Sequence, residues 1–280
     1  MQVESIAENL FFTTVRIDTV NNAGAHGSGT GFIYAHRLSD TQHALFVVTN
    51  KHVVQGMNTG TLTFHQKKDD KPHLGHGFRL DITDWPQAWF GHPLPDVDIA
   101  VVPFIPLEAH IKQQSAIDLF YRCVDSSMLP SSDQLAQLDA IESVTFIGYP
   151  NGIWDSTNLI PVARRGTTAS PLAVDFEGSP RFVIDASVFG GSSGSPVFIL
   201  NQGMYTDKRG NTVIGSRVLF VGVIAAVFFR TELNQIVAVP VPTQTQPMAQ
   251  QREMIDLGIV FKARTVVETI EAFIKSRGDA

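Results

Sequence analysis

The ten residues Phe189–Phe198, FGGSSGSPVF, hold three glycines and three serines between two apolar runs. Flexible linkers lie in polar surroundings, whereas this stretch lies between RFVIDASV and VFIL. A tight turn between buried strands could use these glycines, because glycine adopts positive φ angles without steric cost. The same freedom lets a loop turn backbone N–H groups inward to bind an oxyanion. The stretch is therefore either a structural turn or a loop that carries a nucleophile.

Two serines in this stretch compete for the role of nucleophile. Ser192 is the centre of GGSSG, which formally fits the G-x-S-x-G elbow of the α/β-hydrolases. That fold needs a histidine after the serine in chain order, but all nine histidines lie at or before His110. The chain also lacks the alternating helices of that fold, so the order of residues argues against Ser192.

The second frame, GSSGSP, makes Ser193 the nucleophile and needs a histidine and an aspartate upstream. The stretch VVTNKHVVQG places His52 just after a run that is typical of a strand. The stretch LPDVDIAVVPF places Asp98 at the start of an apolar run, with Asp96 as a rival two residues earlier. The order His, Asp, Ser is therefore present in this chain.

Charge and cysteine content limit the functions that this chain can have. The net charge is −6 and no long Lys/Arg cluster is present, so we expect no nucleic-acid partner. In the run KKDDK the charges largely cancel, and we expect a solvated loop there. The single cysteine excludes an intrachain disulfide. The N-terminal residues lack the pattern of a signal peptide, and no apolar run reaches the ~18 residues of a membrane span. We expect a cytoplasmic protein without a membrane span.

The remaining metal-binding and nucleophilic side chains give no second site. His73 and His76 have a metal-like spacing, but no matching Cys/His pair exists elsewhere, so we expect no metal and no other cofactor. Cys123 has no histidine after it, and it is expected to be a buried structural thiol.

Short runs rich in Val, Ile, Phe and Thr dominate the chain and predict an all-β barrel or sandwich. These runs are FFTTVRI, GTGFIYA, HALFVVTN, GTLTFH, DIAVVPF, SVTFIGYP, RFVIDASV, SPVFIL, VLFVGVIAAVFF, NQIVAVPV and LGIVFKA. Helical patterns are few and are expected over 107–123, 131–140 and 265–277. The polar region 124–132 is the expected division between two halves.

Several segments together resemble the trypsin-like (chymotrypsin-fold) serine peptidases, especially the bacterial branch with the HtrA/Deg proteases and the glutamyl endopeptidases. GTGFIY is similar to the glycine-rich strand before the catalytic histidine, TNKHVV to the histidine motif, and DIAV to the aspartate motif. GSSGSP is similar to the serine motif, and VGVIAA to the strand that lines the cleft. The resemblance covers roughly Phe11 to Ala263. No PDZ domain is expected, because one helical pattern alone follows Ala263.

This resemblance implies a fold of two six-stranded antiparallel β-barrels with a C-terminal helix. The expected domains are 1–125 with the histidine and aspartate, 126–262 with the serine, and 263–280 as the helix. The resemblance further implies that Ser193 attacks the peptide carbonyl, that His52 transfers the proton and that Asp98 orients His52. The backbone N–H groups of Gly191 and Ser193 would form the oxyanion hole.

The resemblance also implies a protein or peptide substrate and a specificity pocket formed by Ser187, Ala225, Ala226 and Val227. Ser187 offers no counter-charge for Lys or Arg, and the branched Val227 narrows the pocket, so we expect cleavage after small or medium aliphatic residues. An intracellular protease must be restrained, and a narrow substrate range, a regulatory protein partner or a late-ordering loop would each do so. The alternative function is a catalytically silent, protease-like peptide-binding module.

Overall fold

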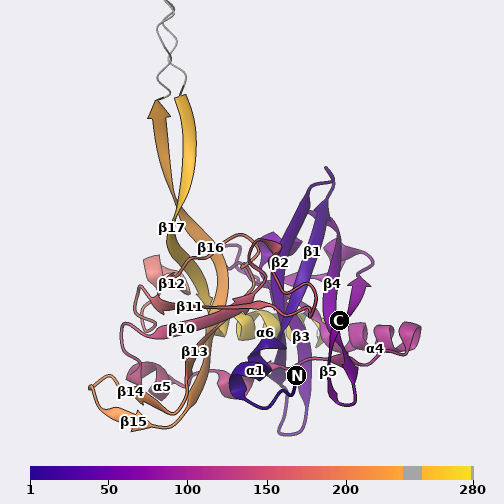
Figure 1. Cartoon of the computed structure of the whole chain (residues 1–280), viewed down its shortest axis with the longest axis horizontal. Helices are drawn as coiled ribbons and strands as arrows, with labels where there is room; N and C mark the ends of the chain where they lie inside the picture. Colours follow the sequence, from indigo (N-terminus) through magenta and orange to yellow (C-terminus); the bar gives the residue numbers. More distant parts are fainter. Residues whose placement is uncertain (236–247, 279–280) are drawn as a thin grey trace, which may run out of the picture.

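The computed structural model describes residues 1–235 and 248–278, with residues 226, 228–235 and 248–255 described by their backbone alone. Two β-rich halves lie side by side: an N-terminal sheet, drawn in indigo and purple, and a C-terminal barrel in pink, orange and yellow (Figure 1). A long two-stranded ribbon extends from the barrel beyond the body of the molecule (Figure 1). The fold class is mostly β, as expected.

The N-terminal half is a nine-stranded sheet rather than the expected six-stranded barrel. The path β5-β4-β1-β2-β3-β7-β6 does not close, because the two-residue strand β6 pairs only with β7 among the described strands. In addition, β8 pairs with β4, and β9 pairs with β2 in parallel. The strands are β1 (Thr14–Asn21), β2 (His26–Arg37), β3 (His43–Thr49), β4 (Met57–Lys68), β5 (Lys71–Asp81), β6 (Phe90–Gly91), β7 (Ala100–Pro103), β8 (Leu119–Phe120) and β9 (Val124–Asp125).

The C-terminal half contains a closed six-stranded barrel in the order β10-β11-β12-β17-β16-β13, which confirms the barrel expected there. A small hairpin of β14 and β15 lies outside it. These strands are β10 (Ser143–Gly148), β11 (Val162–Thr168), β12 (Arg181–Asp185), β13 (Pro196–Asn201), β14 (Met204–Thr206), β15 (Thr212–Ile214), β16 (Arg217–Gln235) and β17 (Met248–Lys262). The expected run NQIVAVPV begins in β16, and its residues 236–241 lie outside the described part of the chain.

Helices cover little of the chain, and the C-terminal helix occurs where the sequence predicts it. They are α1 (Ile6–Phe11), α2 (Lys51–Val54), α3 (Trp85–Ala88), α4 (Phe104–Ser115), α5 (Ser132–Gln137) and α6 (Arg264–Gly278), with 3₁₀ turns at Ser126–Met128, Pro150–Gly152 and Phe176–Gly178. The helix expected over 107–123 ends at Ser115, because Ala116 takes a left-handed conformation with φ 54°. None of the helices in the described residues has the length and apolar character that a membrane crossing requires.

One local expectation is wrong for an identifiable reason, and another is confirmed in more detail. The run FFTTVRI does not begin a strand at Phe11, because Ser5 and Glu8 form a capping box that makes the preceding residues helical. The run KKDDK is exposed to solvent, as expected, and forms the tight turn of the β4–β5 hairpin. Asp69 and Asp70 have φ angles of 50° and 57°, as a two-residue hairpin turn requires.

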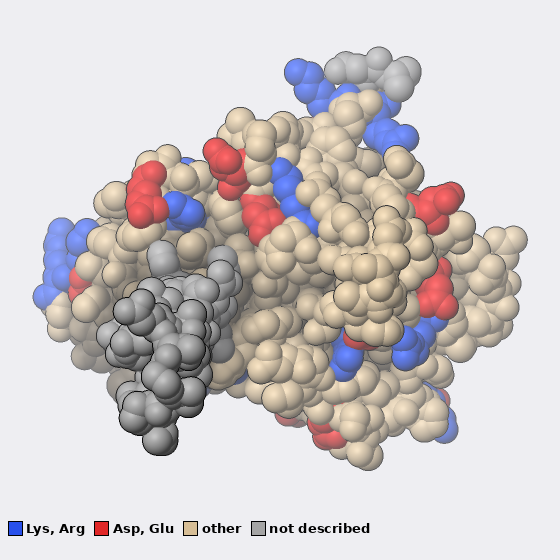
Figure 2. All heavy atoms as spheres, turned by 90° about the horizontal axis from the view of Figure 1, so that it is seen from above, with Lys and Arg blue, Asp and Glu red and all other residues tan. Residues whose placement is uncertain are grey.

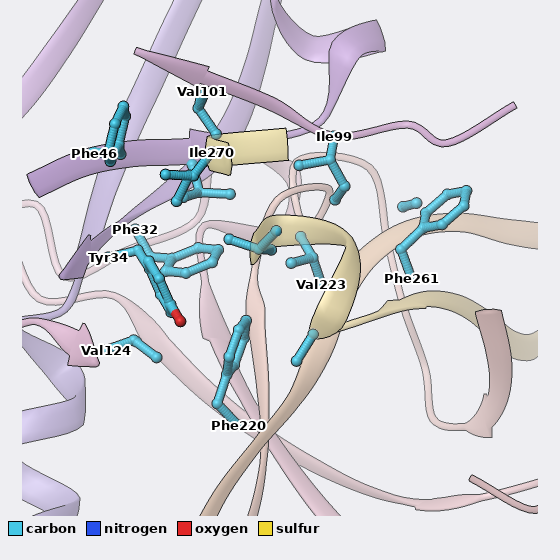
Figure 3. Packing of buried hydrophobic residues seen from close by; sticks show 14 of the residues in the cluster. Phe32, Tyr34, Phe46, Ile99, Val101, Val124, Phe220, Val223, Phe261 and Ile270 are labelled. Atoms are coloured by element: carbon cyan, nitrogen blue, oxygen red, sulfur yellow. The ribbon is translucent and has the colours of Figure 1, made fainter. Parts of the chain in front are cut away.

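The largest hydrophobic core joins the two halves (Figure 3). Phe32 and Phe46 come from the N-terminal sheet, Phe220 comes from the barrel, and Ile270 comes from α6. Burial of each phenylalanine contributes about 1.5–3 kcal/mol to stability. The position of one half relative to the other is therefore fixed by a shared core. The predicted domain limits stay predictions.

Candidate active site

His52 is held at the surface by a helix of one turn that follows a buried strand. The strand β3 ends at Thr49, and α2 begins at Lys51. Val53 and Val54 of this helix are buried in a core cluster of the N-terminal half. Because these two side chains anchor the turn, the His52 side chain points outward and is 50% exposed. The ring is therefore fixed in place and open to a substrate.

Asp98 binds His52 through both carboxylate oxygens. Oδ2 lies 2.5 Å from Nδ1 of the His52 ring, and Oδ1 accepts the backbone N–H of His52 at 3.0 Å. The Asn50 side chain donates to the backbone carbonyl of Asp98 at 2.6 Å. Asp96, the rival aspartate, is exposed to solvent. With Nδ1 donating to a carboxylate, a neutral His52 has Nε2 free to accept a proton.

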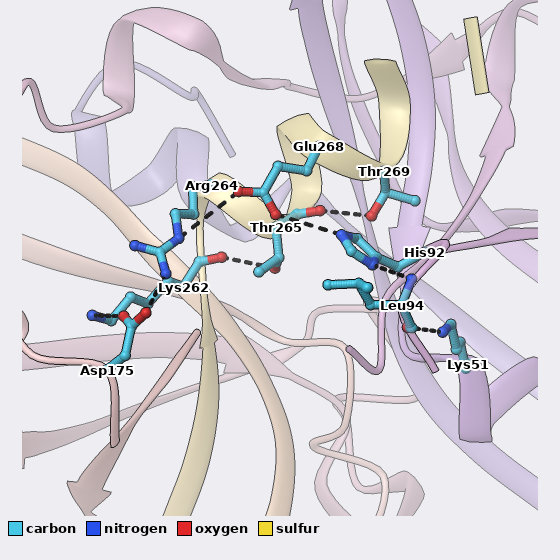
Figure 4. Close-up of polar contacts among 9 residues, drawn as sticks. All are labelled: Lys51, His92, Leu94, Asp175, Lys262, Arg264, Thr265, Glu268 and Thr269. Carbon is cyan, nitrogen blue, oxygen red and sulfur yellow. Dashed lines mark hydrogen bonds and ion pairs between the residues drawn. The ribbon is translucent and has the colours of Figure 1, made fainter. Parts of the chain in front are cut away.

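The segment that leads to Asp98 is anchored by a buried histidine (Figure 4). The backbone N–H of Leu94 donates to Nδ1 of His92 at 3.1 Å, and Nζ of Lys51 donates to the Leu94 carbonyl at 2.8 Å. Nε2 of His92 lies 3.5 Å from the carboxylate of Glu268 in α6. These contacts link the C-terminal helix to the segment before Asp98 and to the neighbour of His52.

The loop of residues 189–195, which carries the glycines and serines, is held through its backbone carbonyls by contacts with both halves. Oγ1 of Thr30, in the N-terminal sheet, donates to the Gly191 carbonyl at 2.9 Å, and the carbonyl of Gly190 accepts from the backbone N–H of Asn151. Gly191 and Gly194 have φ angles of 80° and 89°, which side chains rarely tolerate. The loop is thus held rigidly at the border between the sheet and the barrel.

Among the three serines of the loop, Ser193 is the one that reaches the open site. Ser192 and Ser195 are 1% and 0% exposed, so neither hydroxyl can meet a substrate without a change in the loop. Ser193 is half-buried, and its Oγ donates to the carbonyl of Ala225 at 3.3 Å. Within the described part of the chain, this hydroxyl is bonded to β16 rather than to His52.

Two backbone N–H groups of the loop have no acceptor among the described residues. In the part of the chain that the structure describes, the N–H groups of Gly191 and Ser193 donate to no acceptor, whereas those of Ser192, Gly194 and Ser195 are all bonded. Buried backbone donors are normally paired. Two adjacent free donors next to a hydroxyl are therefore a suitable arrangement for binding an oxygen that gains negative charge.

A pocket of about 320 Å³ lies between the two halves and includes Ser193. It is lined by His52, Asp98, Val188, Phe189, Gly190, Ser193, Ala225 and Val227. Of the predicted specificity residues, Ala225 and Val227 line this pocket, and Ser187 does not. Ala226 is part of β16, but its side chain lies outside the described part of the chain.

Sequence reasoning missed three residues of the pocket wall: Val188, Phe189 and Gly190. Two of them, Phe189 and Gly190, lie in the same short stretch as Ser193, so their proximity in sequence was the available signal. Val188 is buried and Phe189 is half-buried, with the guanidinium of Arg164 4.8 Å from the ring centre of Phe189. The wall of the pocket is therefore more apolar than the predicted set with Ser187 implied.

Neither His73, His76 nor Cys123 forms a second reactive site. The rings of His73 and His76 stack with centroids 3.5 Å apart, and the described residues contain no group of three or more His, Cys, Asp and Glu that could hold a metal. Burial raises the pKa of the Cys123 thiol to about 12, with the nearby acidic groups Asp125 and Glu108 adding to the effect. This thiol is therefore a poor nucleophile at neutral pH.

The close approach of Gly194 to the N-terminal sheet gives a stability prediction. A Cβ at this position would lie 1.8 Å from the Thr30 carbonyl oxygen and 2.6 Å from Oγ1 of Thr49. Gly194→Ala should therefore lower the free energy of unfolding by about 2–6 kcal/mol, from backbone strain and overpacking together. Urea denaturation measures this loss.

Gly203→Ala is the matched control for this substitution. Gly203 has a similar φ of 83°, but a Cβ there would meet nothing within 4 Å. Gly203→Ala should therefore lower the free energy of unfolding by about 1–2 kcal/mol, from backbone strain alone. Equal losses in the two variants would show that the contact with Thr30 is unimportant.

Comparison with known proteins gives one family and several similar structures. A family model described as "Trypsin-like peptidase domain" matches residues 29–204. No curated protein sequence matches the chain significantly. Similar solved structures include the Rv3671c protease of M. tuberculosis in its active form, with 18% identity, a TM-score of 0.48, and coverage of 95% of this chain and 82% of that one.

Two further structures show a similar level of likeness. The thermostable serine protease AL20, from an extremophilic microorganism, has 14% identity and a TM-score of 0.46, with coverage of 94% of this chain and 97% of that one. The tobacco etch virus protease in complex with product has 12% identity and a TM-score of 0.44, with coverage of 81% of this chain and 73% of that one.

Proposed function

The chain belongs to the trypsin-like peptidase domain family, and from this premise we propose that it is a serine endopeptidase with Ser193 as its nucleophile. The observation that carries the proposal is a single pocket lined by Ser193, His52 and Asp98, with Asp98 Oδ2 2.5 Å from Nδ1 of His52. Nucleophile, base and orienting carboxylate are the three groups that acyl transfer through serine requires.

The proposed reaction proceeds through an acyl-enzyme. The Ser193 hydroxyl leaves the Ala225 carbonyl, transfers its proton to Nε2 of His52, and attacks the carbonyl carbon of the peptide bond. The free N–H groups of Gly191 and Ser193 bind the oxyanion of the tetrahedral intermediate. His52 then protonates the leaving amine, and the peptide C–N bond breaks. Water, activated by His52, hydrolyses the acyl-enzyme and restores Ser193.

The finer assignments rest on the sequence. Placement in the bacterial branch with the HtrA and glutamyl endopeptidases is supported by the motifs GTGFIY and GSSGSP. A cytoplasmic location is supported by the single cysteine. On the face in Figure 2, acidic and basic side chains are interspersed, which agrees with a protein or peptide substrate rather than a nucleic acid. A regulatory protein partner stays a prediction.

The test of this proposal is labelling with a serine-directed fluorophosphonate, combined with cleavage of a peptide library read by mass spectrometry. Covalent labelling that competes with cleaved peptides would support a peptidase. The alternative, a silent peptide-binding module, is favoured by the hydrogen bond of Ser193 to Ala225 in place of His52. Peptide binding without labelling or cleavage would support that alternative and refute the peptidase.

We further propose that the residue before the cut is a small or medium aliphatic one, since Val188, Ala225 and Val227 line the pocket. Val227→Gly should enlarge the pocket and shift preference toward Phe or Tyr. Each methylene in such a pocket is worth ~1–3 kcal/mol, so the ratio of kcat/KM for Phe over Val should rise about ten-fold or more.

A size series at Val227 provides the control for this prediction. Val227→Ile should shift the preference toward Ala, in the direction opposite to Val227→Gly. Library profiling of the three proteins measures both shifts. Dominant cleavage of the wild type after Arg, Lys or Glu would refute the assignment of this pocket.

A further inference from the structure

Asp98 lies near the end of a loop, residues 92–99, that joins β6 to β7. The two ends of this 92–99 loop are paired, because the backbone N–H of His92 donates to the Ile99 carbonyl at 2.8 Å. Between these ends, the path of the chain decides where the Asp98 carboxylate lies relative to His52. The contacts inside the loop therefore bear directly on the candidate active site.

The side chain of His92 is 4% exposed, and its ring binds the backbone of the 92–99 loop. Nδ1 accepts the backbone N–H of Leu94 at 3.1 Å. A ring nitrogen that accepts a hydrogen bond carries no proton, so a neutral His92 has its proton on Nε2. The carbonyl of Leu94 accepts from Nζ of Lys51 at 2.8 Å. Residue Leu94 thus connects the buried ring to the neighbour of His52.

The second ring nitrogen of His92 faces Glu268 of α6 (Figure 4). Nε2 lies 3.5 Å from Oε2 of Glu268, and the other carboxylate oxygen lies 3.8 Å from Nε of Arg264. Nη2 of Arg264 in turn lies 2.5 Å from Oδ2 of Asp175. A carboxylate only accepts hydrogen bonds, so of the two neutral tautomers it favours the one with the proton on Nε2. Glu268 therefore selects the form of His92 that can accept from Leu94.

Helix α6 is a fixed support for this contact, because its position depends on apolar packing. Val266 and Ile270 are fully buried in the core that joins the two halves. The ring of Phe273 packs against Phe90 of β6, with centroids 5.6 Å apart. None of these contacts involves the His92 ring. A substitution at His92 should therefore change the 92–99 loop without displacing the helix.

We propose that His92 is a positioning residue for Asp98. Held by Glu268, its ring fixes the 92–99 loop so that the Asp98 carboxylate meets His52. The inference rests on the proposed peptidase function. At Asp98 itself, the Asn50 side chain holds the backbone carbonyl at 2.6 Å, so the loop is fixed both before and at this residue. Misplacing a reacting group by about 1 Å can cost roughly 10² in rate, so a side chain that does not touch the substrate can control turnover.

The first test is the substitution His92→Leu, which removes both ring nitrogens and leaves the Leu94 N–H without its acceptor. We expect kcat to fall about ten-fold or more, with KM within about three-fold, because the substrate contacts stay in place. Steady-state kinetics with a peptide selected from the library measures both values. A folded variant with kcat within about three-fold of the wild type would overturn the proposal.

The conservative variant His92→Asn separates the hydrogen bond from the filling of space. Asparagine readily accepts the backbone N–H two residues ahead, so it can replace Nδ1 as the acceptor for Leu94. Its kcat should lie within about three-fold of the wild type, although asparagine is smaller than histidine. Failure of this rescue would show that the bond to Leu94 is not what positions Asp98.

His65→Leu is the matched control. His65 of β4 is 6% exposed, as His92 is, and its Nδ1 has no hydrogen-bond partner among the described residues. Because His65 lies outside the 92–99 loop, its substitution should change kcat less than about two-fold. Equal losses of kcat in the two leucine variants would refute a specific role of His92.

Nuclear magnetic resonance tests the inference without any catalytic activity. Long-range ¹H–¹⁵N spectra of the protein with ¹⁵N-labelled histidine, recorded at alkaline pH, show which ring nitrogen carries the proton. In the wild type we expect the proton on Nε2 of His92 and on Nδ1 of His52. The signal that disappears in His92→Asn identifies His92. In His92→Leu, the His52 ring should become a mixture of tautomers.

Failure of the inference and failure of the proposed function give different results. If the wild type hydrolyses no peptide, the peptidase function fails, and the tautomers alone decide the role of His92. A proton on Nδ1 of His92 in the wild type, or an unchanged His52 in His92→Leu, would overturn the proposal. If His92→Leu does not fold, the wild-type tautomer of His92 and the kcat of His92→Asn decide it.

Discussion

Ser193→Ala should abolish peptide hydrolysis and fluorophosphonate labelling while leaving the fold intact. Among the described residues, the Ser193 hydroxyl makes one hydrogen bond, at 3.3 Å to the Ala225 carbonyl. The backbone carbonyl of residue 193 accepts the Thr30 N–H, and the variant keeps this bond. We therefore expect the free energy of unfolding to change by less than about 1 kcal/mol. Loss of the nucleophile in another serine protease costs roughly 10⁶ in kcat, and a loss of that order is expected here.

Ser192→Ala is the matched control for this prediction. The Ser192 hydroxyl is buried and has no hydrogen-bond partner among the described residues, so its removal should leave labelling and most of the activity in place. Turnover is measured with a peptide selected from the library, and folding is measured by circular dichroism. Loss of labelling in the Ser192 variant alone would show that the nucleophile is Ser192 and that the loop rearranges in solution.

The candidate catalytic motifs are easily recognised in the sequence because each follows or precedes a buried strand. The apolar run before His52 forms β3, and the run after Asp98 contains β7, as their Val and Ile content predicts. Helix α6 was equally visible, since Val266 and Ile270 recur with helical spacing and are fully buried. Burial and local propensity agree in these segments, so the sequence pattern is clear.

Other elements were hidden because tertiary pairing decides them. Strand β5 contains the sequence HLGHGFRL, whose glycines and histidines interrupt any apolar alternation, and it forms by pairing with β4. Strand β16 was expected to end at Phe229, yet it continues through the mostly polar residues Arg230 to Gln235 because β17 pairs with it. The sequence of Arg230 to Gln235, RTELNQ, has no alternation of apolar and polar residues from which a strand could be predicted.

Three residues that line the candidate site could be predicted from sequence, whereas part of its wall could not. His52, Asp98 and Ser193 each belong to a distinct sequence motif, and they line one pocket. Whether Ser187 or Val188 faces the pocket depends on the path of the backbone after β12, which ends at Asp185. No sequence pattern specifies that path, and the structure places Val188 rather than Ser187 on the pocket wall.

Asp98→Asn should lower kcat by roughly 10⁴, the effect of the corresponding change in another serine protease. Both oxygens of Asp98 accept from His52, one from the backbone N–H at 3.0 Å and one from Nδ1–H at 2.5 Å. Asparagine has one acceptor oxygen. If that oxygen keeps the backbone N–H, the amide NH₂ faces Nδ1 and forces the proton onto Nε2, where it blocks the base.

The control for this prediction is Asp96→Asn, which removes the same charge two residues away from an exposed position. It should change kcat less than about three-fold, since screening by solvent weakens exposed charges. Both variants should keep KM for a peptide selected from the library within about three-fold, because Asp98 acts through His52 and Asp96 is exposed to solvent. Steady-state kinetics on the two variants measures these values. A loss of only a few-fold for Asp98→Asn, or an equal loss for Asp96→Asn, would refute Asp98 as the group that orients His52.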